Sequence, residues 1–133
     1  MENGTIKYCQ EYYHIIYYYN CIIYFRTAPN QTYLSRFFLF IDDFSARGIT
    51  VVLSYPCYEE QSFRNSAALI QKLDTAFRAK ENLLVISVPP SYRFPADYFY
   101  DTYYHLNKEG RSVRTRRLIQ DLQASGLFTI HSP

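Results

Sequence analysis

The order of elements in this chain is set by residues 49–88, which read ITVVLSYPCYEEQSFRNSAALIQKLDTAFRAKENLLVISV. Residues 49–54 and 83–88 are short, nearly continuous apolar runs, as expected of strands covered on both faces. Residues 62–80 between them predict a helix, because apolar residues recur at the spacing of one buried helical face. These residues are Leu69, Ile70, Leu73 and Phe77. The succession of strand, helix and strand predicts a parallel βαβ unit.

A second helix is predicted before this unit, over residues 33–47. Thr32 is a candidate N-cap, and Gly48 stands where a C-terminal glycine belongs. The apolar residues of the helix again share one face, and they are Leu34, Phe37, Phe38, Ile41 and Phe44.

A third helix is predicted after the unit, over residues 108–124, with Gly126 closing it. Its inward residues are expected to be Val113, Leu118, Ile119 and Leu122. Two prolines, Pro89 and Pro90, end the preceding strand because proline cannot donate to a strand ladder. Residues 91–107 are therefore expected to form a long loop.

These elements predict an α/β protein with a doubly wound sheet, but two strands alone cannot make a well-covered sheet. Residues 1–31 are a tyrosine-rich segment that differs from residues 32–133. Seven of the 15 tyrosines fall within the first 25 residues, where β-branched residues also gather. Strands or an irregular helix fit this composition. Either this segment supplies further strands, or the chain is a piece of a larger protein.

The 133 residues fit one domain, and a net charge of +2 is too small to indicate nucleic acid as a partner. Cys9, Cys21 and Cys57 match no zinc or redox spacing, so no metal or cofactor is expected and the thiols are expected to be free. No secretory signal is evident, and the apolar run 14–25 is too short to span a bilayer. A cytoplasmic location is the default expectation.

The loop after the second strand carries the residues best suited to chemistry. Ligands of open α/β folds bind beyond the carboxyl ends of the strands, and Asp97, Asp101 and His105 lie there. A carboxylate can fix the tautomer of an imidazole and stabilise its protonated form. An Asp of this loop can therefore orient His105 as a general base. An Asp and a His four residues apart are also compatible with a local hydrogen bond or a helix cap.

Residues 99–122 read FYDTYYHLNKEGRSVRTRRLIQDL and resemble the last conserved block of the SGNH (GDSL-like) serine hydrolases. The family's commonest form is Asp-x-x-His, and this chain is one residue longer between Asp101 and His105. His105-Leu106-Asn107 and, after it, Gly110-Arg111 and Arg114-Thr115 are similar to one branch of the family. The resemblance covers about residues 33–122. It implies the C-terminal strands and helices of a flavodoxin-like, three-layer fold.

The same resemblance implies that His105 is the general base and Asp101 its orienter, while Asn107 and Gly110 shape the junction between loop and helix. The family's Gly-Asp-Ser nucleophile motif and its oxyanion-hole motifs are not visible in the sequence. Ser54 and Cys57 follow the first strand but lack a nucleophile-elbow pattern.

The resemblance therefore predicts a truncated serine esterase or O-acyl hydrolase or transferase that is inactive alone. Its parent's substrate would be an ester or an O-acylated small molecule or carbohydrate. One alternative is a small α/β interaction module, which could be a homo-oligomer. Another is a complete esterase whose nucleophile is unidentified or comes from a partner chain. The basic residues of 108–117 are expected to be a solvated face or, alternatively, a phosphate- or polyanion-binding surface.

Overall fold

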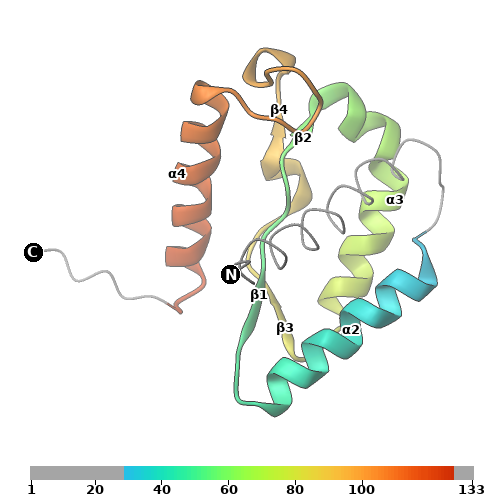
Figure 1. Ribbon diagram of the computed structural model, residues 1–133. Helices are drawn as coiled ribbons and strands as arrows, with labels where there is room; N and C mark the ends of the chain where they lie inside the picture. Colours follow the sequence, from blue (N-terminus) through green and yellow to red (C-terminus); the bar gives the residue numbers. More distant parts are fainter. Residues whose placement is uncertain (1–28, 128–133) are drawn as a thin grey trace, which may run out of the picture.

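The computed structural model describes residues 29–127, which form three helices and short parallel strands (Figure 1). In chain order the elements are α2 (Gln31–Ala46), β1 (Val51–Leu53), β2 (Tyr58–Glu59), α3 (Glu60–Arg78), β3 (Leu83–Val85), η1 (Pro89–Tyr92), β4 (Arg93–Phe94), η2 (Ala96–Tyr98) and α4 (Lys108–Ala124). The prefix η marks a 3-10 helix. The α/β class predicted from the sequence is confirmed.

The strands form one long parallel ribbon that is interrupted in the middle. β1 pairs with β3 so that Val51 faces Leu83, and β2 pairs with β4 farther along the same two chain segments. Between the two pairs, the Tyr55 amide donates to the Ser87 hydroxyl at 3.0 Å, so a side chain replaces the backbone acceptor. Figure 1 shows the two segments, green and yellow, running side by side.

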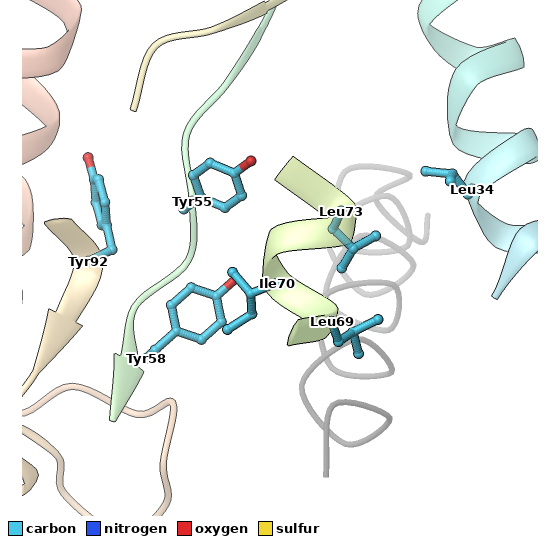
Figure 2. Close-up of a cluster of buried hydrophobic side chains, with 7 residues drawn as sticks. All are labelled: Leu34, Tyr55, Tyr58, Leu69, Ile70, Leu73 and Tyr92. Atoms are coloured by element: carbon cyan, nitrogen blue, oxygen red, sulfur yellow. The ribbon is translucent and has the colours of Figure 1, made fainter. Parts of the chain in front are cut away.

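Helices α2 and α3 lie against the same side of this ribbon, and α4 lies on the other side (Figure 1). The core is a cluster of buried side chains, drawn in Figure 2: Leu34, Tyr55, Tyr58, Leu69, Ile70, Leu73 and Tyr92. Tyr92 lies on the α4 side of the ribbon, away from α3. Phe37 and Phe38 of α2 contact Phe77 of α3, with ring centroids 5.6 and 6.4 Å apart. This contact fixes the two helices to each other and not only to the strands.

Two buried tyrosines keep their hydroxyl groups paired, which holds helices against the strands. Tyr55 donates to Asp74 of α3 at 2.6 Å, and Tyr92 donates to Asp121 of α4 at 2.7 Å. Arg78 joins the first pair, because its guanidinium bonds both Asp74 at 2.9 Å and the Ser87 carbonyl at 2.6 Å. Burial first, and then the adjacent carboxylate, raise the pKa of both phenols, so both stay neutral donors.

The helix boundaries require two corrections to the sequence prediction. The N-cap of α2 is Asn30 and not Thr32, because the Asn30 side chain accepts from the amides of Thr32 and Tyr33 at 3.0 and 3.4 Å. Helix α3 begins at Glu60, two residues before the predicted start, since the Glu59 carboxylate caps it. Gly48 and Gly126 have positive φ angles of 73° and 72°, as their predicted helix-ending positions require.

Two further predictions were wrong in part. Residues 91–107 are not a plain loop, because Arg93 and Phe94 form β4 and short 3-10 turns flank it. Helix α4 spans the predicted residues, but Ile119 is 44% exposed and Gly110 is the helix's buried residue. The remaining predicted inward residues, Val113, Leu118 and Leu122, are half-buried.

The Glu59 cap predicts a pH-dependent stability. Glu59 is only 7% exposed, and its carboxylate accepts from the Gln61 amide and from the amide and hydroxyl of Ser62 at 2.8–3.0 Å. Burial disfavours the charged form, but these hydrogen bonds outweigh it, so the pKa of Glu59 is lowered. A lowered pKa means that the ionised cap stabilises the fold above the unfolded-state value of about 4.3 and that this contribution is lost as pH falls through the folded value.

We therefore expect Glu59→Gln to lower the free energy of unfolding by about 1 kcal/mol at pH 7, because it removes the charge and one acceptor oxygen. Urea denaturation of the full chain at pH 7 and at pH 3.5 measures this, with the exposed Glu81→Gln as the matched control. The difference from wild type should shrink at the lower pH. A difference that persists unchanged at pH 3.5 would show that the ionised carboxylate is not the stabilising group.

Candidate functional site

The loop that carries Asp101 and His105 is closed at its base by backbone hydrogen bonds. Phe99 and Leu106 form an antiparallel bridge, and the Tyr100 amide donates to the His105 carbonyl at 2.8 Å. One step farther out, the Asn107 amide donates to the Tyr98 carbonyl at 2.9 Å. Residues 100–105 therefore form a turn that is closed at its base by these local hydrogen bonds.

Within this turn the predicted pair meets. The Nδ1 atom of His105 lies 2.9 Å from Oδ1 of Asp101. When Nδ1 carries the proton and donates it to the carboxylate, Nε2 is left as the basic nitrogen. The His105 amide also donates to the Thr102 hydroxyl at 3.2 Å, and the Tyr104 ring meets the imidazole edge-on at 4.8 Å. These contacts fix both the backbone and the ring of His105.

The pair is open to solvent, with 54% of the His105 side chain and 55% of the Asp101 side chain exposed. Water screens such a pair, so its contribution to stability is small. The exposure also leaves the imidazole accessible to an incoming group. Asp97 is not part of the pair. Its side chain is exposed, and its backbone carbonyl accepts from the side-chain amide of Asn107 at 2.6 Å.

The junction between the turn and α4 is built by Asn107 and Gly110, as expected. The Asn107 side chain accepts from the Gly110 amide at 2.9 Å and so caps the helix. Gly110 is buried, and a Cβ atom placed on it would lie 2.5 Å from the Tyr98 carbonyl oxygen. Only glycine allows the helix to approach this closely, and the approach sets the base of the turn.

The Cys57 side chain contacts the turn from the segment between β1 and β2. This contact was not predicted from the sequence. Its thiol donates to the Tyr104 carbonyl, with 3.8 Å between sulfur and oxygen, across 47 positions of sequence. Burial raises the pKa of Cys57, and nearby Arg114 opposes this only partly. The thiol therefore stays protonated, which makes Cys57 a weak nucleophile and a structural contact.

Ser54, the other weak candidate for a nucleophile, directly follows β1 and has a buried hydroxyl oxygen. This oxygen has no hydrogen-bond partner among residues 29–127. No base is therefore in position to take its proton in this part of the chain.

Two of the basic residues at the start of α4 have partners in the body of the protein. The Arg114 guanidinium lies over the Tyr92 ring at 5.8 Å, and Arg117 donates to the Ser91 carbonyl at 2.7 Å. Both thus hold α4 against η1. The side chains of Lys108, Arg111 and Arg116 are exposed, and Lys108 and Arg111 are three positions apart and so lie on neighbouring positions of one helix face.

Among residues 29–127, no three His, Cys, Asp or Glu side chains gather closely enough to hold a metal ion. None of the described helices is long and apolar enough to cross a membrane. The chain matches no protein-family model, and comparisons with curated proteins and with solved structures give no significant match.

The close approach at Gly110 gives a direct test of how the turn is held. We expect Gly110→Ala to lower the free energy of unfolding by about 1–3 kcal/mol, because the added methyl group meets a backbone oxygen that cannot rotate away. The exposed Ser112→Ala in the same helix should change it by less than about 0.5 kcal/mol. Thermal denaturation of the full chain measures both. Equal stabilities for the two variants would mean that α4 does not approach Tyr98 as described.

Proposed function

We propose that this chain carries the base half of an SGNH-type ester hydrolase and is catalytically incomplete by itself. The observation that supports this most is the hydrogen bond between Asp101 and His105 on a turn that directly precedes the last helix. In the resembling family an Asp and a His stand at this place. Carboxylate, imidazole and open Nε2 are the arrangement that a general base requires.

The arrangement of the elements supports the same proposal. The βαβ unit β1–α3–β3 is followed by the turn and then by α4 on the opposite side of the ribbon (Figure 1). That order fits the C-terminal end of a flavodoxin-like, three-layer fold, in which site loops follow the carboxyl ends of the strands.

In this proposal His105 Nε2 takes the proton of a hydroxyl nucleophile as that oxygen attacks an ester carbonyl. Asp101 keeps Nδ1 protonated and stabilises the imidazolium, and the same proton later passes to the leaving alcohol. The nucleophile and the donors that stabilise the oxyanion are not supplied by residues 29–127. These groups account for most of the rate enhancement in acyl transfer, so the pair alone gives little catalysis.

The substrate class of the complete site would be an ester, such as an O-acyl group on a small molecule or a carbohydrate. This follows from the family resemblance. The described geometry supports it only to the extent that the imidazole is reachable from solvent.

Two measurements on the full chain test the proposal. With a fluorophosphonate probe, intact mass should show no stoichiometric adduct, because the proposal places no activated serine among residues 29–127. With p-nitrophenyl acetate, slow hydrolysis should be seen that His105→Ala removes and Asp101→Asn reduces. His14→Ala is the matched control, since it removes a histidine outside the described residues.

The outcomes separate the alternatives. A stoichiometric probe adduct that is lost in His105→Ala would mean that the chain is a complete serine hydrolase. Hydrolysis that is the same in His105→Ala and His14→Ala would mean that His105 is not a base, and the Asp–His contact would then be a loop-fixing hydrogen bond alone.

A further inference from the structure

The side chains of Tyr100 and His105 lie on one face of the turn. Phe99 and Leu106 form the backbone bridge at its base, and the Tyr100 amide donates to the His105 carbonyl one step beyond this bridge at 2.8 Å. Tyr100 and His105 are therefore directly opposite each other across the antiparallel pair. Residues in this relation carry their side chains on the same face, with Cβ atoms about 4.5–5.5 Å apart.

The burial of the neighbouring pair shows which way this face points. Phe99 and Leu106 are half-buried, and a Cβ atom placed on Gly110 of α4 would lie 3.0 Å from the Leu106 side chain. Side chains of successive residues in a strand point to opposite faces. The face that carries Tyr100 and His105 therefore points away from α4, and both side chains are exposed, with Tyr100 at 83%.

The exposed ring of Tyr100 is thus a neighbour of the proposed base. Asp101 holds Nδ1 of His105, which leaves Nε2 as the nitrogen that an incoming group can reach. Because the two side chains leave the same face of the turn, a ligand bound at the imidazole has the Tyr100 ring beside it. Tyrosine is well suited to such a contact, since its ring offers a large apolar surface and has few degrees of freedom to lose.

The polar side chains of the turn are already used within it. Asp101 bonds the His105 ring, and the Thr102 hydroxyl accepts from the His105 amide. The Asn107 side chain caps α4. A sugar requires several polar groups that converge on it, whereas a tyrosine ring holds another aromatic ring by offset stacking or edge-to-face contact alone. The turn therefore favours an aromatic ligand over a sugar.

We propose that Tyr100 contacts the substrate and that the ester taken by this site carries an aromatic ring, packed against the Tyr100 ring beside His105 Nε2. This inference rests on the proposed function and adds the substrate class to it. The contact requires the ring of Tyr100 and not its hydroxyl group. Aromatic pairs of this kind change an affinity by about two- to tenfold.

Binding of a ketone that cannot be hydrolysed tests the contact without turnover. Phenylacetone has the shape of phenyl acetate, with a methylene group in place of the ester oxygen. Added to the isotope-labelled full chain, it should shift the ring signals of Tyr100 and His105 in nuclear magnetic resonance spectra. Overhauser contacts should join its ring protons to those of Tyr100. Cyclohexylacetone, of similar size but without an aromatic ring, should bind more weakly.

Three variants assign the binding to the Tyr100 ring. Tyr100→Ala should weaken the binding of phenylacetone about two- to tenfold, and Tyr100→Phe should retain it. Tyr33→Ala is the matched control, because it removes an exposed tyrosine of α2. Equal affinities for Tyr100→Ala and Tyr33→Ala would overturn the proposal, as would tighter binding of methyl glucopyranoside than of phenylacetone. If Tyr100→Ala disturbs the turn, Tyr100→Phe and the wild-type Overhauser contacts decide.

Hydrolysis of phenyl acetate separates this inference from the proposed function. Its kcat/KM should fall about two- to tenfold in Tyr100→Ala, while that of cyclohexyl acetate should not change. Hydrolysis that His105→Ala removes and Tyr100→Ala leaves unchanged would support the proposed function and contradict the aromatic contact. Hydrolysis that His105→Ala leaves unchanged would contradict the proposed function and, with it, the role of the bound ring as part of a substrate.

Discussion

The parallel pairing of β1 with β3 is the constraint on which the rest of the structure depends. Parallel neighbours cannot be joined by a tight turn, so the chain must return along a helix, and α3 is that helix. Because both strands run in the same direction, the segments that leave them emerge at the same end of the ribbon. That is why Cys57, which follows β1, lies beneath the carbonyl of Tyr104, which follows β3 and β4.

Three of the seven buried side chains of the core cluster are tyrosines. Tyr55, Tyr58 and Tyr92 fill the space beside the ribbon, and a buried phenol must keep a hydrogen-bond partner. Asp74 and Asp121 supply partners from α3 and α4. Each helix is thereby fixed in rotation as well as in distance, because only one face of it carries the accepting carboxylate. These directional hydrogen bonds help to fix how each helix is oriented against the strands, in addition to apolar packing.

The sequence predicted those features whose signals are local. Helix α4 was predicted from end to end because a cap at Asn107 and a glycine at Gly126 mark its ends. The contact of Asp101 with His105 was predictable because four positions separate them in one turn. The cap of α2 was misplaced because Asn and Thr are both good caps and stand two residues apart.

Features that depend on distant residues could not be predicted. The two-residue strand β4 exists only because β2 lies beside it, and its own sequence shows no strand pattern. The Cys57 contact joins residues far apart in the chain, and no periodicity indicates it. Ile119 follows the helical repeat of inward residues, yet α4 is held to the body by Tyr92, Arg114 and Arg117, which leaves Ile119 exposed.

The candidate site and the sheet therefore differ in how they are maintained. The Asp101–His105 pair is held mostly by hydrogen bonds within residues 97–110, and Cys57 adds one contact from the segment after β1. Under the proposed function, other chain segments or a partner must bring a nucleophile and oxyanion donors to Nε2. Because the proposed base is built mostly from local hydrogen bonds, it does not require those groups to be present, and an Asp–His pair does not by itself make a complete enzyme.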